Sequence, residues 1–403
     1  MFSKVAARRI APPHDMPHTD IVIIGGAAIG SAAAYFLRRA PQAPAVVVIE
    51  PDPTYALAST ARATGGVRRL FSCPENIRMS QASMAFFAHA GEHLAVDGEA
   101  PDLGWKPGGY LFVVDQRAAR IVERNAATQA SLGVDVQLLD RAALAARFPS
   151  IRSDDLTLAA YTPGDGWLDP NALLQGLRKK AQHLGATYLK DRVTGMRREG
   201  KRVGAVQLAA GETITCDCVI NATGAWAAGV CAFIGMPLPV APMRRFEHYV
   251  EVAQTLEPLP LIKDLDRLVA RPEGRGYAVG LVDGSEQRGF NFEVDPTYFE
   301  RVVWPALAHR LPAFEVLKLK SEWSGLYDEN ELDGNMILGN WAGVVDNFYV
   351  AAGFSGHGLM HAPAVGRALA ELILEGGYRT LDLARMDYRR VQANAPYREE
   401  GIV

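Results

Sequence analysis

The stretch that decides the fold is DIVIIGGAAIG, residues 20–30. Its β-branched run, residues 21–24, is typical of a strand buried on both faces, and the two glycines after it are typical of a tight turn. An alanine-rich segment, residues 31–39, predicts a helix, and AVVVIE, residues 45–50, predicts a second buried strand that ends in an acid. Together these segments predict one βαβ unit of about thirty residues.

Such a unit can bind the pyrophosphate of a dinucleotide, because a helix N-terminus offers backbone N–H groups and the positive end of its dipole. Gly25 allows the tight turn, Gly30 lets the helix lie close to the strand, and Glu50 can accept hydrogen bonds from ribose hydroxyls. One position departs from the pattern, since Ala27 stands where the middle glycine belongs, with Gly26 beside it. We expect its methyl group to be tolerated at some cost in affinity. The unit alone leaves NAD, FAD and an unliganded α/β core open.

The composition sets broader limits. A chain of 403 residues with 49% apolar and 22% charged residues is typical of a globular protein of about two domains. The formal charge of −3 gives no overall attraction to nucleic acid or to an anionic membrane. No apolar run is long enough for a transmembrane segment. The four cysteines form no CxxC pair or zinc spacing, so we predict no metal site and a cytoplasmic location.

Periodicity predicts the remaining elements. Residues 1–19 are basic and lack a secretory apolar stretch, so we expect a disordered leader, with a short transit peptide as the alternative. We expect strand-like pieces between residues 240 and 295. The predicted helices are 74–94, 116–132, 168–184, 298–310 and 361–375, and the predicted strands are 186–189, 203–208, 218–221 and 348–352.

Two further motifs carry a family resemblance. VINATGAW, residues 219–226, resembles the ATG-type strand and turn of two-dinucleotide-fold flavoproteins, where it packs near the ADP portion of the flavin. GFSGHG, residues 353–358, resembles the C-terminal signature of the D-amino acid oxidase and sarcosine oxidase superfamily, the DAO family. In that family the helix after this turn faces the pyrimidine edge of the flavin, where its N–H groups stabilise the negative charge of the reduced ring. The resemblance runs from Asp20 to about Leu383 and implies FAD.

A narrower resemblance lies in ATGGVR (63–68), CPENI (73–77), WP (304–305), WSGLYD (323–328) and residues 354–362. These motifs are similar to a subgroup that contains an FAD-dependent oxidoreductase domain protein linked to mitochondrial complex I assembly, and many bacterial relatives. The subgroup supports the cofactor more than it defines a substrate.

The DAO resemblance implies oxidation of a C–N bond beside a carboxylate, in which hydride passes to flavin N5 and water hydrolyses the resulting imine. We therefore expect a secondary or N-substituted amino acid as substrate, and O2 or a respiratory carrier as electron acceptor. Oxidase and dehydrogenase both stay open. The alternative from another class is a flavoprotein that acts as an assembly or binding factor with little turnover.

The resemblance also implies roles for single residues. Arg68 matches the position of a substrate-binding arginine, and its guanidinium suits a carboxylate; the alternative is a surface or pyrophosphate-neutralising role. Tyr327 matches a tyrosine on the substrate side of the flavin, or it packs in the core. His357 is expected to position the backbone rather than transfer protons. Trp226 and Trp323 are expected in the core.

Departures from sarcosine oxidase matter as well. Gly325 replaces the cysteine that bonds covalently to FAD, so we expect a noncovalent, dissociable flavin. Met360 replaces a second carboxylate-binding lysine, which favours a bulkier or differently anchored substrate. The lysine that promotes the reaction with oxygen has no clear match, and the candidates to face the flavin are Arg271, Arg275 and Arg288.

The predicted fold class is α/β, with a Rossmann-type FAD-binding domain interleaved with an antiparallel-sheet substrate domain. The FAD-binding domain takes residues 20–80, 145–232 and 325–395, and the substrate domain takes 81–144 and 233–324. The predicted catalytic residues are Arg68, Tyr327 and His357. The predicted cofactor-binding residues are Gly25, Gly26, Ala27, Ala28, Ile29, Gly30, Glu50, Pro51, Ala61, Arg62, Thr64, Gly65, Gly66, Val193, Ala222, Thr223, Gly224, Trp226, Gly325, Tyr327, Gly353, Phe354, Ser355, Gly356, His357, Gly358, Leu359 and Met360.

Overall fold

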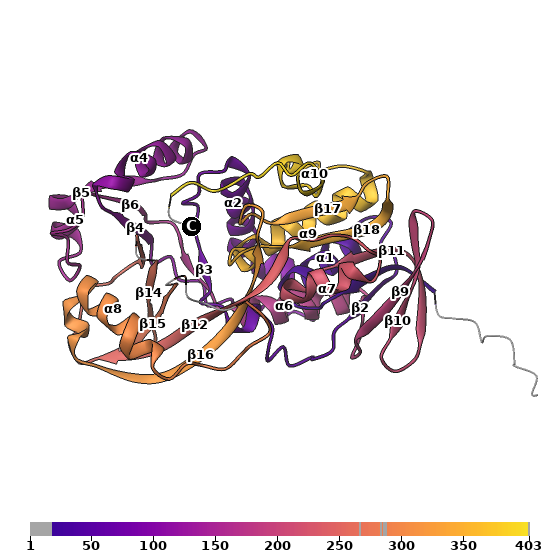
Figure 1. Ribbon diagram of the computed structural model, residues 1–403, viewed down its shortest axis with the longest axis horizontal. Coiled ribbons are helices and arrows are strands. Elements are labelled where there is room, and N and C mark those ends of the chain that lie inside the picture. The colour runs from indigo at the N-terminus through magenta and orange to yellow at the C-terminus, as the bar shows by residue number, and fades with distance from the viewer. Residues whose placement is uncertain (1–17, 266, 283, 285–287, 402–403) are drawn as a thin grey trace, which may run out of the picture.

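The computed structural model describes residues 18–265, 267–282, 284 and 288–401, and the predicted leader lies almost wholly outside them. Two eight-stranded sheets organise the chain (Figure 1). The first runs β17-β18-β11-β1-β2-β8, with β10 and β9 added beside β11. Its centre is parallel, as the βαβ prediction requires. Its strands are β1 (His18–Ile24), β2 (Val46–Ile49), β8 (Thr187–Leu189), β9 (Val193–Glu199), β10 (Arg202–Leu208), β11 (Thr213–Asn221), β17 (Ile337–Trp341) and β18 (Val345–Ala352).

Both faces of this sheet are buried. Ile23 of β1 packs in the apolar cluster under the helices, and its neighbour Val22 packs in a second cluster on the opposite face. Helix α1 crosses α9 closely because position 366 is glycine: a β-carbon there would lie 2.6 Å from the backbone of Ala32. The helices of this half are α1 (Ala28–Arg39), α2 (Pro74–Ala88), α3 (Ala90–Leu94), α6 (Pro170–His183), α7 (Ala227–Ala232), α9 (Gly358–Glu375) and α10 (Arg389–Gln392).

The second sheet runs β16-β12-β15-β14-β13-β4-β6-β5 and is antiparallel except for the β13–β4 pair. Its long strands β12 and β16 reach toward the first sheet (Figure 1). Its strands are β4 (Tyr110–Val114), β5 (Gln137–Asp140), β6 (Leu158–Thr162), β12 (Val240–Val252), β13 (Leu261–Asp264), β14 (Leu268–Glu273), β15 (Gly276–Leu281) and β16 (Leu317–Asn330). Near it lie α4 (Gln116–Ser131), α5 (Arg141–Arg147) and α8 (Trp304–Arg310), while β3 (Gly66–Val67) pairs with β7 (Gly166–Trp167).

The structure confirms the predicted fold class and corrects several boundaries. The predicted helix 74–94 is two helices, because the chain breaks at His89, which has φ −114° and ψ 26°. A π-helical turn, Phe299–Val303, precedes α8, since Pro305 has no N–H to offer an α-helical bond. Helix α9 begins at Gly358, three residues earlier than predicted.

The division into domains remains a prediction. Strand β6 lies in the 145–232 segment that we assign to the FAD-binding domain, yet it pairs with β4 and β5 in the second sheet. None of the helices within the described ranges combines the length and the apolar character that a bilayer span needs.

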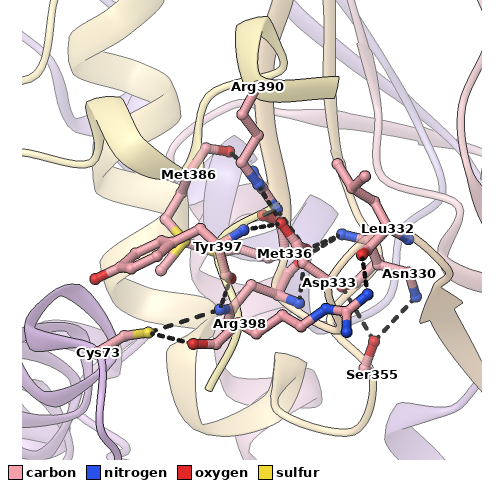
Figure 2. Close-up of polar contacts among 12 residues, drawn as sticks. Cys73, Asn330, Leu332, Asp333, Met336, Ser355, Met386, Arg390, Tyr397 and Arg398 are labelled. Atoms are coloured by element: carbon pink, nitrogen blue, oxygen red, sulfur yellow. Dashed lines mark hydrogen bonds and ion pairs between the residues drawn. The ribbon is translucent and has the colours of Figure 1, made fainter. Parts of the chain in front are cut away.

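The C-terminal segment, residues 395–401, ties the two halves together. The buried carboxylate of Asp333 accepts hydrogen bonds from Arg390 Nε at 2.8 Å and from the backbone N–H of Tyr397 at 2.9 Å (Figure 2). Farther along, Glu400 forms an ion pair with Arg124 of α4. The segment is thus held at one end by the first half of the molecule and at the other by α4.

Candidate functional site

A cavity of about 1230 Å³ is lined by residues from both sheets. Small-molecule pockets are typically about 300–1,000 Å³, so this one has room for a dinucleotide and a small second ligand. Its walls come from the β1–α1 turn, the end of β2, the turn before α9, and the cavity faces of β12, β13 and β16.

The β1–α1 turn brings the N-terminus of α1 to the cavity wall. Gly25 has φ +94°, and a β-carbon there would lie 2.6 Å from the carbonyl oxygen of Ala222. At Gly30 a β-carbon would lie 1.9 Å from the carbonyl oxygen of Gly25. Ala27 is the N-cap of α1, its side chain makes no capping hydrogen bond, and the first turn contains no acid. The helix end is therefore suited to an anionic group such as a pyrophosphate.

Glu50 follows β2 at the same wall. Its Oε2 accepts a hydrogen bond from the N–H of Gly26 and its Oε1 accepts one from the N–H of Asp52, each at 2.9 Å. Burial raises the pKa of Glu50, and the two backbone N–H groups oppose that shift. The carboxylate is fixed in position and keeps lone pairs for a ribose hydroxyl.

A second helix N-terminus reaches the cavity through the turn 353–358. Asp328 of β16 fixes the turn by accepting hydrogen bonds from the N–H groups of Gly353 at 2.8 Å and Phe354 at 3.2 Å. Gly356 has φ +98°, and a β-carbon there would lie 2.6 Å from the ring of Tyr327. Helix α9 has no side-chain cap and no acid in its first turn. Two uncapped helix ends facing one long cavity fit an extended dinucleotide such as FAD.

Arg68 lies where the turn before α9 meets the second sheet. Its Nη2 donates to Nε2 of His357 at 2.9 Å, and its Nη1 donates to the carbonyl oxygen of Leu70 at 3.0 Å. The guanidinium carbon also lies 4.1 Å from the ring centre of Phe71. Because the nitrogen of His357 accepts, that ring is neutral, and burial together with the charge of Arg68 lowers its pKa well below the usual value. His357 thus holds Arg68 by a hydrogen bond in this arrangement.

The second sheet forms the wall of the cavity opposite the two helix ends, and we call this wall the roof. Arg245 and Glu247 of β12, Lys263 of β13 and Tyr327 of β16 all line the cavity. The guanidinium carbon of Arg245 lies 5.0 Å from the ring centre of Tyr327. Burial and the neighbouring charges, led by Arg68, lower the pKa of Lys263 well below its usual value. The guanidinium groups of Arg68 and Arg245 make this end of the cavity suited to a carboxylate, and a bound carboxylate would favour the charged form of Lys263.

Most of the residues predicted from sequence line this cavity. Arg62 also donates from Nε to the carbonyl oxygen of Ala56 at 2.7 Å and from Nη1 to the carbonyl oxygen of Ser324, and the second bond fixes it beside β16. The predicted residues in the wall are Gly25, Ala27, Ala28, Ile29, Glu50, Pro51, Arg62, Thr64, Gly65, Gly66, Arg68, Val193, Ala222, Thr223, Gly224, Trp226, Gly325, Tyr327, Phe354, Ser355, Gly356, His357, Gly358, Leu359 and Met360. The predicted residues outside the wall are Gly26, Gly30, Ala61 and Gly353.

Several other expectations need correction. Trp226 is not in the core: its side chain is 39% exposed and stacks on Phe290 with ring centres 5.2 Å apart. The roof candidates Arg271, Arg275 and Arg288 do not line the cavity. Arg288 pairs with Glu331 and Arg271 with Glu273 instead.

Sequence reasoning missed Arg245, Glu247 and Lys263. A sequence signal exists for Arg245 and Glu247. They are two positions apart in RRFEHYV, residues 244–250, and alternate positions of a strand lie on the same face. Lys263 lies in a short apolar strand whose partners are distant in sequence, so no local pattern identifies it.

The comparisons with known proteins agree with this geometry. The model of the family "FAD dependent oxidoreductase" (DAO) matches residues 20–372. The chain is 38% identical to FAD-dependent oxidoreductase domain-containing protein 1 of Xenopus laevis, over 97% of this chain and 87% of that protein. It is 26% identical to mitochondrial sarcosine dehydrogenase of Mus musculus, over 94% of this chain and 42% of that protein.

Among solved structures, L-proline dehydrogenase from P. horikoshii superposes with a TM-score of 0.84 at 26% identity, covering 95% of this chain and all of that chain. Together with the two uncapped helix ends and the fixed carboxylate of Glu50, these matches identify FAD as the cofactor. The chain therefore belongs to the DAO family of FAD-dependent oxidoreductases.

Proposed function

We propose that this oxidoreductase oxidises the C–N bond of a secondary or N-substituted amino acid. The observation that supports the proposal most is the set of basic side chains, Arg68, Arg245 and Lys263, at the roof end of the FAD cavity. Two of the relatives point the same way, because sarcosine and L-proline, in their names, are both secondary amino acids.

In this proposal the chain binds and orients the substrate. The cations hold the carboxylate, and the ring of Tyr327 and the apolar side chain of Met360 restrict water around the reacting carbon. FAD, when bound, supplies the two-electron acceptor for the hydride that leaves the α-carbon or the N-alkyl carbon. The substrate nitrogen loses a proton, a C=N bond forms, and water then hydrolyses it to an amine and a carbonyl compound.

No side chain needs to act as a nucleophile. Arg68 stays protonated beside His357, which is neutral and already accepts its hydrogen bond. We propose the cytoplasm as the compartment, because all four cysteines are unpaired, as expected under reducing conditions.

The test is anaerobic titration of the purified yellow protein with sarcosine, L-proline, N-methyl-L-alanine and glycine, followed at the visible flavin absorption. Bleaching by the N-substituted compounds in preference to glycine is the expected result. Admission of air then separates the acceptors, since rapid recovery of the colour indicates O2 and slow recovery indicates another carrier.

Lys263→Met should raise the substrate concentration needed for half-bleaching by at least ten-fold. The exposed Arg275→Ala, outside the cavity, is its matched control. An oxidised flavin throughout a broad amine panel contradicts the proposal and favours the assembly or binding role.

A further inference from the structure

The side chain of Glu247 lies on the roof in space that is free because its cross-strand neighbour is a glycine. It lies on β12 opposite Gly280 of β15 and Trp323 of β16. A β-carbon at position 280 would lie 3.0 Å from Oε1 and 3.1 Å from Oε2 of Glu247. The carboxyl group therefore lies over Gly280, at the cavity wall, where any larger residue would push it away.

This carboxyl group has no protein partner within the described part of the chain. Its Oε2 is buried without a hydrogen bond, and no donor to Oε1 is found among the same residues. Burial raises the pKa of Glu247 to about 8, and Arg271 opposes that shift only in part. Buried polar groups in native proteins are nearly always hydrogen-bonded, so a carboxyl group left open toward a cavity indicates a partner that arrives from the cavity.

The charged groups on the same face of the sheet indicate the kind of ligand that would bind this carboxyl group. Glu247, Gly280, Val269 and Lys263 form one row across four neighbouring strands. With about 4.8 Å between strands, the backbones of Glu247 and Lys263 are about 14 Å apart. Arg245 is two residues away along β12, a backbone distance of about 7 Å. The roof thus presents a hydrogen-bond acceptor flanked by cations, which complements a ligand that has both a carboxylate and an N–H group.

The other ionisable groups near Glu247 do not serve as the hydrogen-bond acceptor for such a ligand. Tyr249 is on the same face of β12, Arg271 is on β14 and Tyr327 is on β16. Arg271 is engaged with Glu273, and the arginines and the lysine of the roof are all donors. Glu329, another acid of the cavity wall, already lies 3.8 Å from Arg245. On this face of the described sheet, Glu247 is thus an acid with a buried oxygen that accepts no hydrogen bond.

We propose that Glu247 is a specificity-determining residue that accepts a hydrogen bond from the nitrogen of the ligand, and so selects amino acids with an N–H group over acids of the same shape without one. The inference rests on the proposed function for the identity of the substrate, but its test does not require turnover. Sites built around a buried hydrogen-bonding group discriminate strongly against ligands that leave the group unpaired.

The test uses two flat acids that differ in one atom, pyrrole-2-carboxylate and furan-2-carboxylate. Neither has the sp³ C–H beside nitrogen that oxidation would need, so both report binding alone through the change in the flavin spectrum. The wild-type FAD-bound protein should bind the pyrrole acid about ten-fold or more tightly than the furan acid. Glu247→Leu should bring the ratio of the two Kd values close to one, and the isosteric Glu247→Gln should reduce it.

The matched control is Glu251→Gln, a change of the same kind on the same face of β12, outside the cavity, where Glu251 pairs with Lys320. It should keep the wild-type ratio. Flavin content and a thermal melt verify that each variant is folded, and Glu247→Met, which also lacks a strong acceptor, serves if the leucine variant is not. Equal binding of the two acids by the wild type, or an unchanged ratio in a folded leucine or methionine variant, overturns the inference. If the ratio depends on Glu247 while no amine bleaches the flavin, the proposed function fails and this inference stands.

Discussion

Nη2 of Arg68 lies 2.9 Å from Nε2 of His357, although 289 positions separate the two residues in the sequence. Arg68 is only 2% exposed, and no carboxylate of a described residue lies within ion-pairing distance of it. The pair joins the segment after β3 to the turn that opens α9. It leaves the positive charge of Arg68 available to a ligand in the cavity, since histidine satisfies a hydrogen bond without neutralising that charge.

Arg68→Lys should impair substrate binding more than cofactor binding. Lysine keeps the charge but cannot reproduce both hydrogen bonds of the guanidinium. We expect kcat/KM for a carboxylate substrate to fall by roughly 30-fold or more, with the ratio of FAD to protein unchanged. Steady-state kinetics and flavin release measure the two quantities. Loss of FAD instead would place Arg68 in the cofactor site.

His357→Phe should destabilise the protein, and His357→Gln should restore most of the loss. Phenylalanine leaves a buried donor of Arg68 unpaired, at a cost of about 1–3 kcal/mol, whereas glutamine offers an acceptor. Because the pKa of His357 is well below 6.5 in the folded protein, the unfolded chain binds the proton first as pH falls. The wild type should therefore lose stability as pH falls below about 6.5, and His357→Phe should lose less. Urea unfolding at several pH values measures both effects.

Gly30→Ala and Ala27→Gly form a contrasting pair in the β1–α1 turn. The new methyl group at position 30 would lie 1.9 Å from a backbone oxygen, so we expect destabilisation by about 3 kcal/mol or more and loss of FAD. Ala27 has φ −70°, which suits any residue, so Ala27→Gly should leave stability within about 1 kcal/mol. Thermal melts and FAD titration of the apoprotein check both; equal effects would contradict the assigned geometry.

Glu50→Gln should weaken FAD binding without changing the substrate preference. The amide keeps a similar shape but loses the charge that strengthens hydrogen bonds with ribose hydroxyls and with the N–H groups of Gly26 and Asp52. We expect the Kd for FAD to rise about ten-fold or more. Asp52→Asn, beside it, tests whether the effect is specific to position 50. The measurement is fluorescence quenching of FAD by the apoprotein.

Glu247→Gln should make the protein more stable, and the gain should grow with pH. The pKa of Glu247 is about 8 in the folded state against 4.5 ordinarily, so between these values the unfolded chain has lost a proton that the folded chain retains. Wild-type stability must then fall as pH rises from 4.5 to about 8. Over that window the variant should gain on the order of a few kcal/mol relative to the wild type. A difference in Tm that does not vary with pH would contradict the burial of this carboxyl group.

Local sequence was sufficient for the features that depend on neighbours in the chain. The β1–α1–β2 unit follows from a β-branched run, glycines at fixed offsets and a terminal acid, all within residues 20–50. The turn 353–358 was recognised by its resemblance to the C-terminal signature of the DAO family, and the structure shows positive φ at its glycines 353 and 356. The break at His89 was missed, because helical periodicity continues across it.

The roof could not be predicted in the same way. Glu247 and Lys263 face one cavity only because β12, β15, β14 and β13 pair in that order, and their registers depend on strands distant in sequence. Arg271 shows the converse, since it lies in the strand-rich region expected to cover the flavin, yet it pairs with Glu273 and does not line the cavity. The identity of a side chain can be read from the local sequence, but the cavity wall that the side chain faces depends on the register of the sheet.

The cavity is walled by residues 24, 25 and 27–29 from one part of the chain and by residues 354–360 from another. A ribosome must therefore translate most of the message before both walls exist. We expect a nascent polypeptide that ends before residue 360 to retain no coenzyme, because one wall of the cavity is still missing.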